Sequence, residues 1–160
     1  MLVFDASSII YAWDNYPIEQ FPGLWNWMAE QVSMQQIVMP DVALDEVHNK
    51  IPECSAWLKD NGLLVILTGN AALHKAKRIK SLLGIEGDRY HPKGVGENDI
   101  LIIATASLQG VNLVSDEERQ QVAPQVQAKR KIPSVCGMKE VAVECINFLD
   151  YIKSSAVVFR

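Results

Sequence analysis

The sequence has little cysteine and no cysteine pattern that would build a disulfide framework or a zinc site. Its three cysteines are an odd number, and none forms a Cys-x-x-Cys pair, which predicts reduced, buried thiols. No apolar run approaches the roughly 18 residues that a membrane span needs, and the first residues, MLVFDASS, lack the basic region of a signal peptide. The sequence therefore predicts a cytoplasmic protein without membrane attachment.

An excess of positive charge is also absent. The 160 residues carry 15 Lys and Arg against 19 Asp and Glu, a formal net charge of −4. This balance argues against a protein that coats nucleic acid through bulk positive charge, and it leaves room for an enzyme with a local basic path. Hydrophobic residues make up 49% of the chain, which is enough for a packed core. The length predicts a single domain over residues 1–160.

Several familiar catalytic and phosphate-binding motifs are missing as well. The chain has neither a GxGxxG after its first predicted strand nor a Walker A loop. Ser7 stands where a haloacid-dehalogenase-type phosphatase would carry its second aspartate. The three histidines lie in no nucleophile-elbow context. These absences leave the carboxylates as the main candidates for chemistry.

Short apolar runs alternate with helical patterns along the chain. Five runs predict strands, the last of them at a sheet edge: residues 2–4, 36–39, 63–67, 111–115 and 132–136. Apolar spacing and capping residues predict helices at 24–32, 41–49, 71–83, 99–109 and 138–152. The glycine-rich residues 84–96 are expected to form a mobile loop. Strands that alternate with helices favour an α/β fold with an open parallel sheet covered on both faces.

Acidic residues fall where such a sheet binds its ligands, outside the carboxyl ends of the strands. Asp5 ends the first predicted strand, and Asp116 and Glu117 follow the fourth. Glu46 lies in the helix after the second strand, and Asp99 lies in a first helical turn that Asn98 is expected to cap. Each acid alone also fits an ordinary turn, a cap or a solvated surface.

Taken together, these acids predict a cation site. Like charges that converge raise one another's pKa unless a cation neutralises them. Ligands that are all oxygen favour a hard ion, Mg²⁺ or Mn²⁺. A carboxylate-held ion of this kind activates water and stabilises a phosphoryl-transfer transition state.

Four segments resemble the four signature segments of the PIN-domain nucleases, whose best-known members are the VapC-like toxins of bacterial toxin–antitoxin pairs. They are LVFDAS at residues 2–7, PDVALDE at 40–46, NDILIIATA at 98–106 and LVSDE at 113–117. The order and spacing of the segments agree with the family over nearly the whole chain. The tracts 21–47 and 131–136 are similar to a less characterised bacterial PIN-like subgroup.

The resemblance implies a three-layer α/β/α fold with a parallel sheet in the order 3-2-1-4-5. It places the family's metal-binding and catalytic acids on Asp5, Glu46, Asp99 and a fourth residue, either Asp116 or Glu117. The hydroxyl residues that support the metal shell match Ser7 and Ser115. The implied activity is a Mg²⁺- or Mn²⁺-dependent endoribonuclease that hydrolyses RNA phosphodiester bonds. The implied partners are an antitoxin protein and a second copy of the chain in a homodimer.

Basic residues that could receive RNA phosphates occur in three places. Arg89, Tyr90 and Lys93 precede Asp99 and combine charge with a stacking ring. A predicted helix carries Lys75 and Arg78 among other bases, and a third group lies at residues 129–131. All of these charges also fit a solvated surface.

Two functions of other classes stay open from the sequence. The chain fits a PIN-like binding or scaffold protein whose acids do not catalyse, because the register of the fourth acid is ambiguous. It also fits a metal-dependent phosphatase that acts on small phosphoesters.

Overall fold

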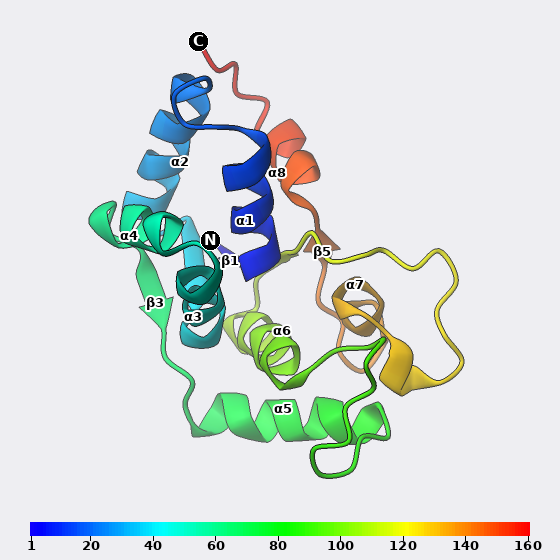
Figure 1. The fold of residues 1–160 in the computed structure, drawn as a ribbon. Coiled ribbons are helices and arrows are strands. Elements are labelled where there is room, and N and C mark those ends of the chain that lie inside the picture. The colour runs from blue at the N-terminus through cyan, green and yellow to red at the C-terminus, as the bar shows by residue number, and fades with distance from the viewer.

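A five-stranded parallel sheet forms the centre of the computed structural model, which describes residues 1–160 (Figure 1). The strands are β1 (Leu2–Phe4), β2 (Ile37–Pro40), β3 (Leu64–Ile66), β4 (Leu113–Val114) and β5 (Cys145–Ile146). They lie in the order β3-β2-β1-β4-β5, and every neighbouring pair is parallel. The expected strand order is confirmed.

Helices cover the sheet on both sides, which gives the three layers of an α/β/α fold. They are α1 (Ala6–Asn15), α2 (Pro22–Ser33), α3 (Asp41–Lys50), α4 (Pro52–Asp60), α5 (Asn70–Leu82), α6 (Glu97–Gln109), α7 (Ile132–Cys136) and α8 (Phe148–Ser155). In Figure 1, α1, α2 and α8 lie on one side of the strands, and α5, α6 and α7 lie on the other. None of the helices has both the length and the apolar character that crossing a membrane requires.

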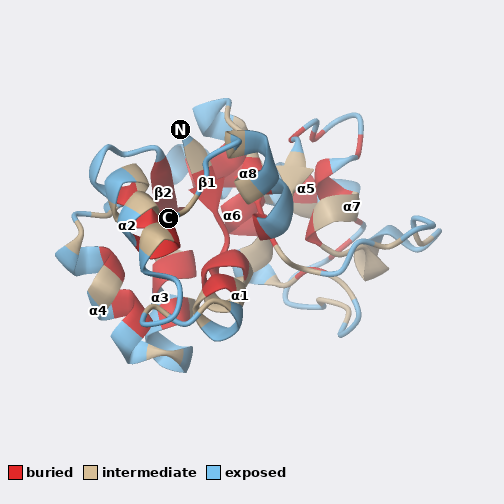
Figure 2. Ribbon diagram, turned by 90° about the horizontal axis from the view of Figure 1, so that it is seen from above, coloured by how far each residue is buried: buried red, intermediate tan, exposed pale blue.

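Burial explains why the central elements form where the sequence predicts them. Every residue of β2 is buried, as expected for a strand covered on both faces. Helix α6 is buried continuously from Ile100 to Ala106, so it forms the centre of its layer (Figure 2). Gly110 ends α6 in the left-handed conformation with φ 64°, which a residue without Cβ adopts at little cost.

The last third of the chain corrects two predictions. Residues 132–136 form α7 and not an edge strand, and Pro133 lies in its first turn, where a missing N–H breaks no helical hydrogen bond. The fifth strand is β5, inside the predicted helix 138–152. The helix there begins only at Phe148, because the Asn147 side chain accepts a hydrogen bond from Asp150 N at 2.8 Å and caps it.

Other boundaries also differ from the sequence predictions. Helices α1 and α4 were not predicted. Helix α6 begins two residues earlier than expected, and its N-terminal cap is Gly96 and not Asn98. These differences matter below, because Gly96 and Asn98 both lie at the candidate site.

The loop of residues 84–96 contains no helix or strand, as predicted, but both of its ends are fixed. Ile85 and Val95 are buried, and Val95 N donates a hydrogen bond to Arg130 O at 3.0 Å. Beside this bond, a Cβ built on Gly94 would lie 1.8 Å from the carbonyl oxygen of Ala128. The C-terminal end of the loop therefore packs directly against the backbone of residues 128–130, in the segment that follows β4.

Gly94→Ala is expected to lower the free energy of unfolding by about 1–3 kcal/mol, because the added methyl group must push two backbone segments apart. Urea unfolding followed by circular dichroism measures the change. Gly137→Ala is the matched control, since the nearest atom to its Cβ would be Pro133 O at 3.5 Å, an ordinary contact. Equal stability of the two variants would contradict the close contact at Gly94.

Candidate metal centre

Asp5 lies at the carboxyl end of β1, directly before α1, and its exposed fraction is only 2%. Its Oδ2 accepts hydrogen bonds from the hydroxyls of Ser7, at 2.5 Å, and Ser115, at 2.9 Å. Ser115 directly follows β4, which pairs in parallel with β1. Parallel pairing therefore brings the ends of the two strands together and holds this carboxylate from both sides.

Asp99 and Glu46 reach the same region from two helices that contact each other, α6 and α3. Asp99 is in the first turn of α6, where its Oδ2 accepts a hydrogen bond from Gly96 N at 2.9 Å. The Asn98 side chain lies beside the Glu46 carboxylate, where it acts to lower the pKa of that group. A hollow of about 310 Å³ lies between them, lined by Glu46, Gly96, Glu97, Asn98 and Asp99.

The acids at this edge of the sheet perturb one another's protonation. Burial raises the pKa of Asp99 to about 6, and the negative charges of Asp5, Glu117 and Glu46 add to the shift. Burial also raises the pKa of Glu46, and the charges of Asp5 and Glu117 act in the same direction. The pKa of Asp5 is raised by burial against the effect of its hydroxyl partners. Four carboxylates from separate segments thus form one electrostatic group.

The fourth member of this group is Glu117, while Asp116 is engaged elsewhere. Asp116 Oδ1 accepts hydrogen bonds from the Ser8 hydroxyl, at 2.7 Å, and from Phe148 N, at 2.9 Å. Asp116 therefore ties α1 to the first residue of α8. Glu117 N donates to Ser115 Oγ at 3.2 Å, and the Glu117 charge acts on Asp99 and Glu46. These contacts favour Glu117 over Asp116 as the acid whose charge reaches Asp99 and Glu46.

The chemistry of this donor set fits a hard divalent cation. The set consists of carboxylate oxygens, supported by hydroxyls and an amide, with no sulfur or imidazole ligand. A cation would relieve the repulsion that adds to the effect of burial on the pKa of Glu46 and Asp99. As arranged here, no three of the His, Cys, Asp and Glu side chains are close enough together to bind one ion.

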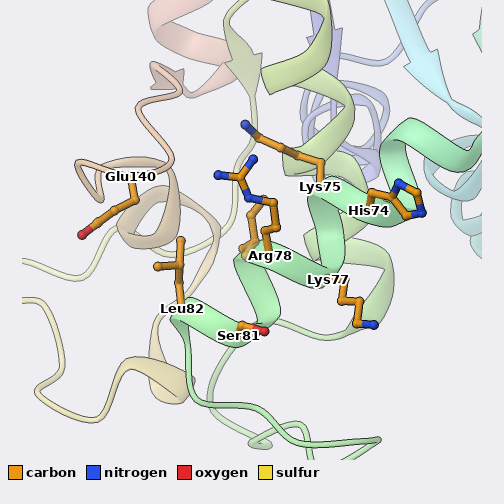
Figure 3. A pocket seen from close by; sticks show the side chains of 8 residues that line it. His74, Lys75, Lys77, Arg78, Ser81, Leu82 and Glu140 are labelled. Atoms are coloured by element: carbon orange, nitrogen blue, oxygen red, sulfur yellow. The ribbon is translucent and has the colours of Figure 1, made fainter.

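The predicted RNA-contacting residues do not gather at the acids. Lys75 and Arg78 lie on α5 and line a separate cavity of about 610 Å³, in which Glu140 forms the opposite wall (Figure 3). None of the four grouped acids lines that cavity. In the loop 84–96, Arg89 and Lys93 are exposed. Tyr90 is partly buried, and Lys80 Nζ lies 5.1 Å from the centre of its ring.

The sequence predictions missed the role of Asn98 at this site. Its place just before a predicted helix is typical of a cap, and only the approach of α3 makes it a partner of Glu46. The link between Ser8 and Asp116 was missed for the same reason, since it joins residues 108 positions apart. No local signal in the sequence would have found either contact.

Comparison with known proteins identifies the family. The model of the family described as "Domain of unknown function (DUF4411)" matches residues 2–159. The chain belongs to this family. A search of curated proteins gives no match to this DUF4411 chain.

Solved structures share the fold of the DUF4411 chain at low sequence identity. DNA-bound VapBC from Salmonella typhimurium is 16% identical, with a TM-score of 0.57 over 92% of this chain and 97% of that one. PAE2754 from Pyrobaculum aerophilum is 14% identical, with a TM-score of 0.56 over 98% and 97%. FitAB bound to an IR36 DNA fragment is 11% identical, with a TM-score of 0.52 over 92% and 94%. The likeness is one of fold, and it confirms the PIN-domain fold that the signature segments predict.

Proposed function

We propose that this DUF4411 protein is a metal-dependent endoribonuclease that hydrolyses RNA phosphodiester bonds and serves as the toxin of a bacterial toxin–antitoxin pair. The observation that carries the proposal is that Asp5, Glu46, Asp99 and Glu117 lie at one edge of the sheet, where burial raises the pKa of the first three and neighbouring negative charges add to the shifts of Glu46 and Asp99. The PIN-domain fold shared with VapBC and FitAB supports it.

Mg²⁺ or Mn²⁺ is the cofactor of the proposed reaction. Asp5 and Asp99, the two most buried acids of the group, would hold the ion directly, and Glu46 and Glu117 would bind it through water. The bound ion supplies positive charge that stabilises the phosphoryl-transfer transition state and makes water easier to deprotonate.

The side chains of the protein do the positioning and the proton transfer. The hydroxyls of Ser7 and Ser115 fix the orientation of Asp5. The partly buried Glu46, which lies beside Asn98, would accept the proton of the water that attacks phosphorus in line. Its raised pKa makes it a better base than an ordinary glutamate.

The proposed partners follow from the same assignment. Arg89, Tyr90 and Lys93 lie in the loop that ends at Gly96 of the hollow, so we assign them to the RNA path. Lys75 and Arg78 would contact RNA only where it extends across α5. The similar structures of VapBC and FitAB are each bound to DNA. By extension, the proposed protein partners are an antitoxin and a second copy of the chain, and the proposed location is the cytoplasm.

Cleavage of an end-labelled RNA oligonucleotide by the purified protein tests the proposal. We expect shortened RNA with Mn²⁺ or Mg²⁺, none with a chelator, and no phosphate release from a phosphomonoester. Phosphate release from the monoester with intact RNA would identify a phosphatase. Intact RNA and no Mn²⁺ binding by calorimetry would identify a binding or scaffold protein.

Glu117→Gln is expected to lower the rate of Mn²⁺-dependent cleavage by about 10–100-fold, because a water-mediated ligand loses its charge. Asp116→Asn, at the neighbouring residue, is the matched control. Its amide oxygen still accepts hydrogen bonds from Ser8 and Phe148 N, so we expect a rate close to that of the unmodified protein. Single-turnover assays measure both rates. The opposite ranking would assign the fourth acid to Asp116.

A further inference from the structure

A hollow of about 230 Å³, separate from the acidic one, lies between helices α5 and α6, which pack against each other. The face of α5 that lines this α5–α6 hollow carries residues at positions i, i+3, i+4 and i+7, namely Leu73, Ala76, Lys77 and Lys80. The start of α6 supplies Glu97, Ile100 and Leu101. The loop 84–96 supplies the ring of Tyr90. The hollow thus combines apolar walls with one aromatic ring, two amines and one carboxylate.

Glu97 connects the α5–α6 hollow to the acidic one. It lines both hollows, and it is exposed at the start of α6, two residues before Asp99. On the other side, Lys77 lines both the α5–α6 hollow and the cavity that contains Lys75 and Arg78. Figure 3 shows Lys75 and Arg78 extending to one side of α5 and Lys77 to another. A strand with a phosphate at the acids would therefore meet the α5–α6 hollow next and the basic cavity after it.

The contents of the α5–α6 hollow suit a nucleotide. Tyr90 is partly buried and packs against the core, so its ring is held in place for stacking. Lys80 Nζ lies 5.1 Å from the centre of that ring, which keeps a positive charge beside it. A base would stack on the ring between the apolar walls, and its phosphate would lie near the amines of Lys77 and Lys80.

The carboxylate of Glu97 favours one base over the others. A carboxylate only accepts hydrogen bonds, and it has two oxygens. Guanine presents two adjacent donors, N1–H and the N2 amino group, which match these two oxygens. Adenine and cytosine present one amino donor next to a ring nitrogen that accepts, and uracil presents one N–H between two carbonyls. Those acceptors would face a carboxylate oxygen and repel it.

We propose that the α5–α6 hollow is a guanine-binding subsite that holds a nucleotide beside the phosphodiester bond to be cleaved. Tyr90 stacks on the base, and Glu97 accepts hydrogen bonds from its N1–H and N2 amino group. Lys77 and Lys80 contact the phosphate. The position of the cleaved bond rests on the proposed nuclease function, whereas recognition of the base does not. Glu97 is thereby the residue that sets base preference.

Binding of short RNAs without metal tests the subsite. Fluorescein-labelled RNAs of five nucleotides carry uridine at every position except the centre, which is guanosine, adenosine, cytidine or uridine. Fluorescence anisotropy with a chelator measures their affinities for the full-length protein while no cleavage can occur. We expect the guanosine RNA to bind about 10-fold more tightly than the other three.

Glu97→Gln is expected to abolish this preference, because an amide has only one accepting oxygen and presents a donor in place of the second. Glu53→Gln is the matched control. Glu53 is also exposed in the first turn of a helix, α4, and it lines none of the three hollows. The Glu53 variant should retain the guanosine preference of the unmodified protein.

Two variants at Tyr90 test the stacking. Tyr90→Leu keeps an apolar side chain against the core and is expected to weaken binding of all four RNAs by about 10-fold. Tyr90→Phe keeps the ring and should bind them as the unmodified protein does. Equal affinities of the two variants would refute the stacking role, and circular dichroism checks that both are folded.

Binding and cleavage distinguish failure of the subsite from failure of the nuclease proposal. A guanosine preference that depends on Glu97, without Mn²⁺-dependent cleavage of any RNA, would support the subsite and refute the nuclease. Cleavage of RNA together with equal affinities for the four RNAs would refute the subsite alone. A guanosine preference that persists in Glu97→Gln, a preference for another base, or no binding of any of the four RNAs would also overturn the subsite.

Discussion

Asp5→Asn is expected to lower Mn²⁺-dependent RNA cleavage by at least about 100-fold, which corresponds to about 2.7 kcal/mol of lost transition-state stabilisation. Asn retains an oxygen that accepts the hydrogen bonds of Ser7 and Ser115, so the fold around the buried side chain is expected to persist. What the substitution removes is the negative charge that holds the cation. Single-turnover cleavage of labelled RNA measures the rate, and circular dichroism checks the fold.

Asp45→Asn is the matched control for this loss. Asp45 lies next to Glu46 on α3 but is exposed, so the substitution changes the net charge equally without touching the grouped acids. We expect the Asp45 variant to cleave RNA at the rate of the unmodified protein. Undiminished cleavage by the Asp5 variant would overturn the assignment. Equal loss in both variants would show that overall charge, and not the site, sets the rate.

The free energy of unfolding of the metal-free protein is expected to be about 1–3 kcal/mol larger at pH 5 than at pH 7.5. The pKa of Asp99 is about 6 in the folded protein and 3.8 ordinarily. Between these values the folded state binds more protons than the unfolded state, so stability falls as the pH rises through this window. The raised pKa values of Asp5 and Glu46 act in the same direction. Urea unfolding with a chelator at each pH measures the difference.

Mn²⁺ is expected to restore the lost stability at pH 7.5, because it binds the folded state and neutralises the repulsion among the acids. Asp99→Asn should raise the melting temperature of the metal-free protein at pH 7.5, flatten its pH dependence and abolish the Mn²⁺ effect. Asp45→Asn should leave all three unchanged. A metal-free protein whose stability increases from pH 5 to pH 7.5 would contradict the electrostatic description of the site.

The sequence predicts those features whose signal is local. The run Leu2–Phe4 followed by Asp5 predicts both the strand and the position of its acid, and Gly110 marks the end of α6. The region 132–152 was predicted wrongly, because its apolar residues fit a helical spacing across the break between β5 and α8. Nothing within the segment indicates that Cys145 and Ile146 pair with Leu113 and Val114 of β4.

The choice between Asp116 and Glu117 shows the same limit at the level of single side chains. The two acids are adjacent, and both are compatible with a polar turn after β4. The Asp116 side chain is oriented by Ser8 and Phe148, which are far away in the sequence and contact it only in the folded chain. The sequence therefore places two acids after β4, while the choice between them as the fourth acid of the proposed site depends on tertiary contacts.

The close contact between Gly94 and the Ala128 carbonyl has a consequence for how the proposed nuclease could be inhibited. The loop 84–96 leads into the turn that carries Asp99, and the segment under it leads back to Glu117. Backbone contact between the two couples their positions. A protein that bound the outer surface of the loop and displaced it would therefore move Asp99 relative to Glu46 on α3 without entering the hollow. Such an inhibitor would change the geometry of the acids and would not need to fill the site.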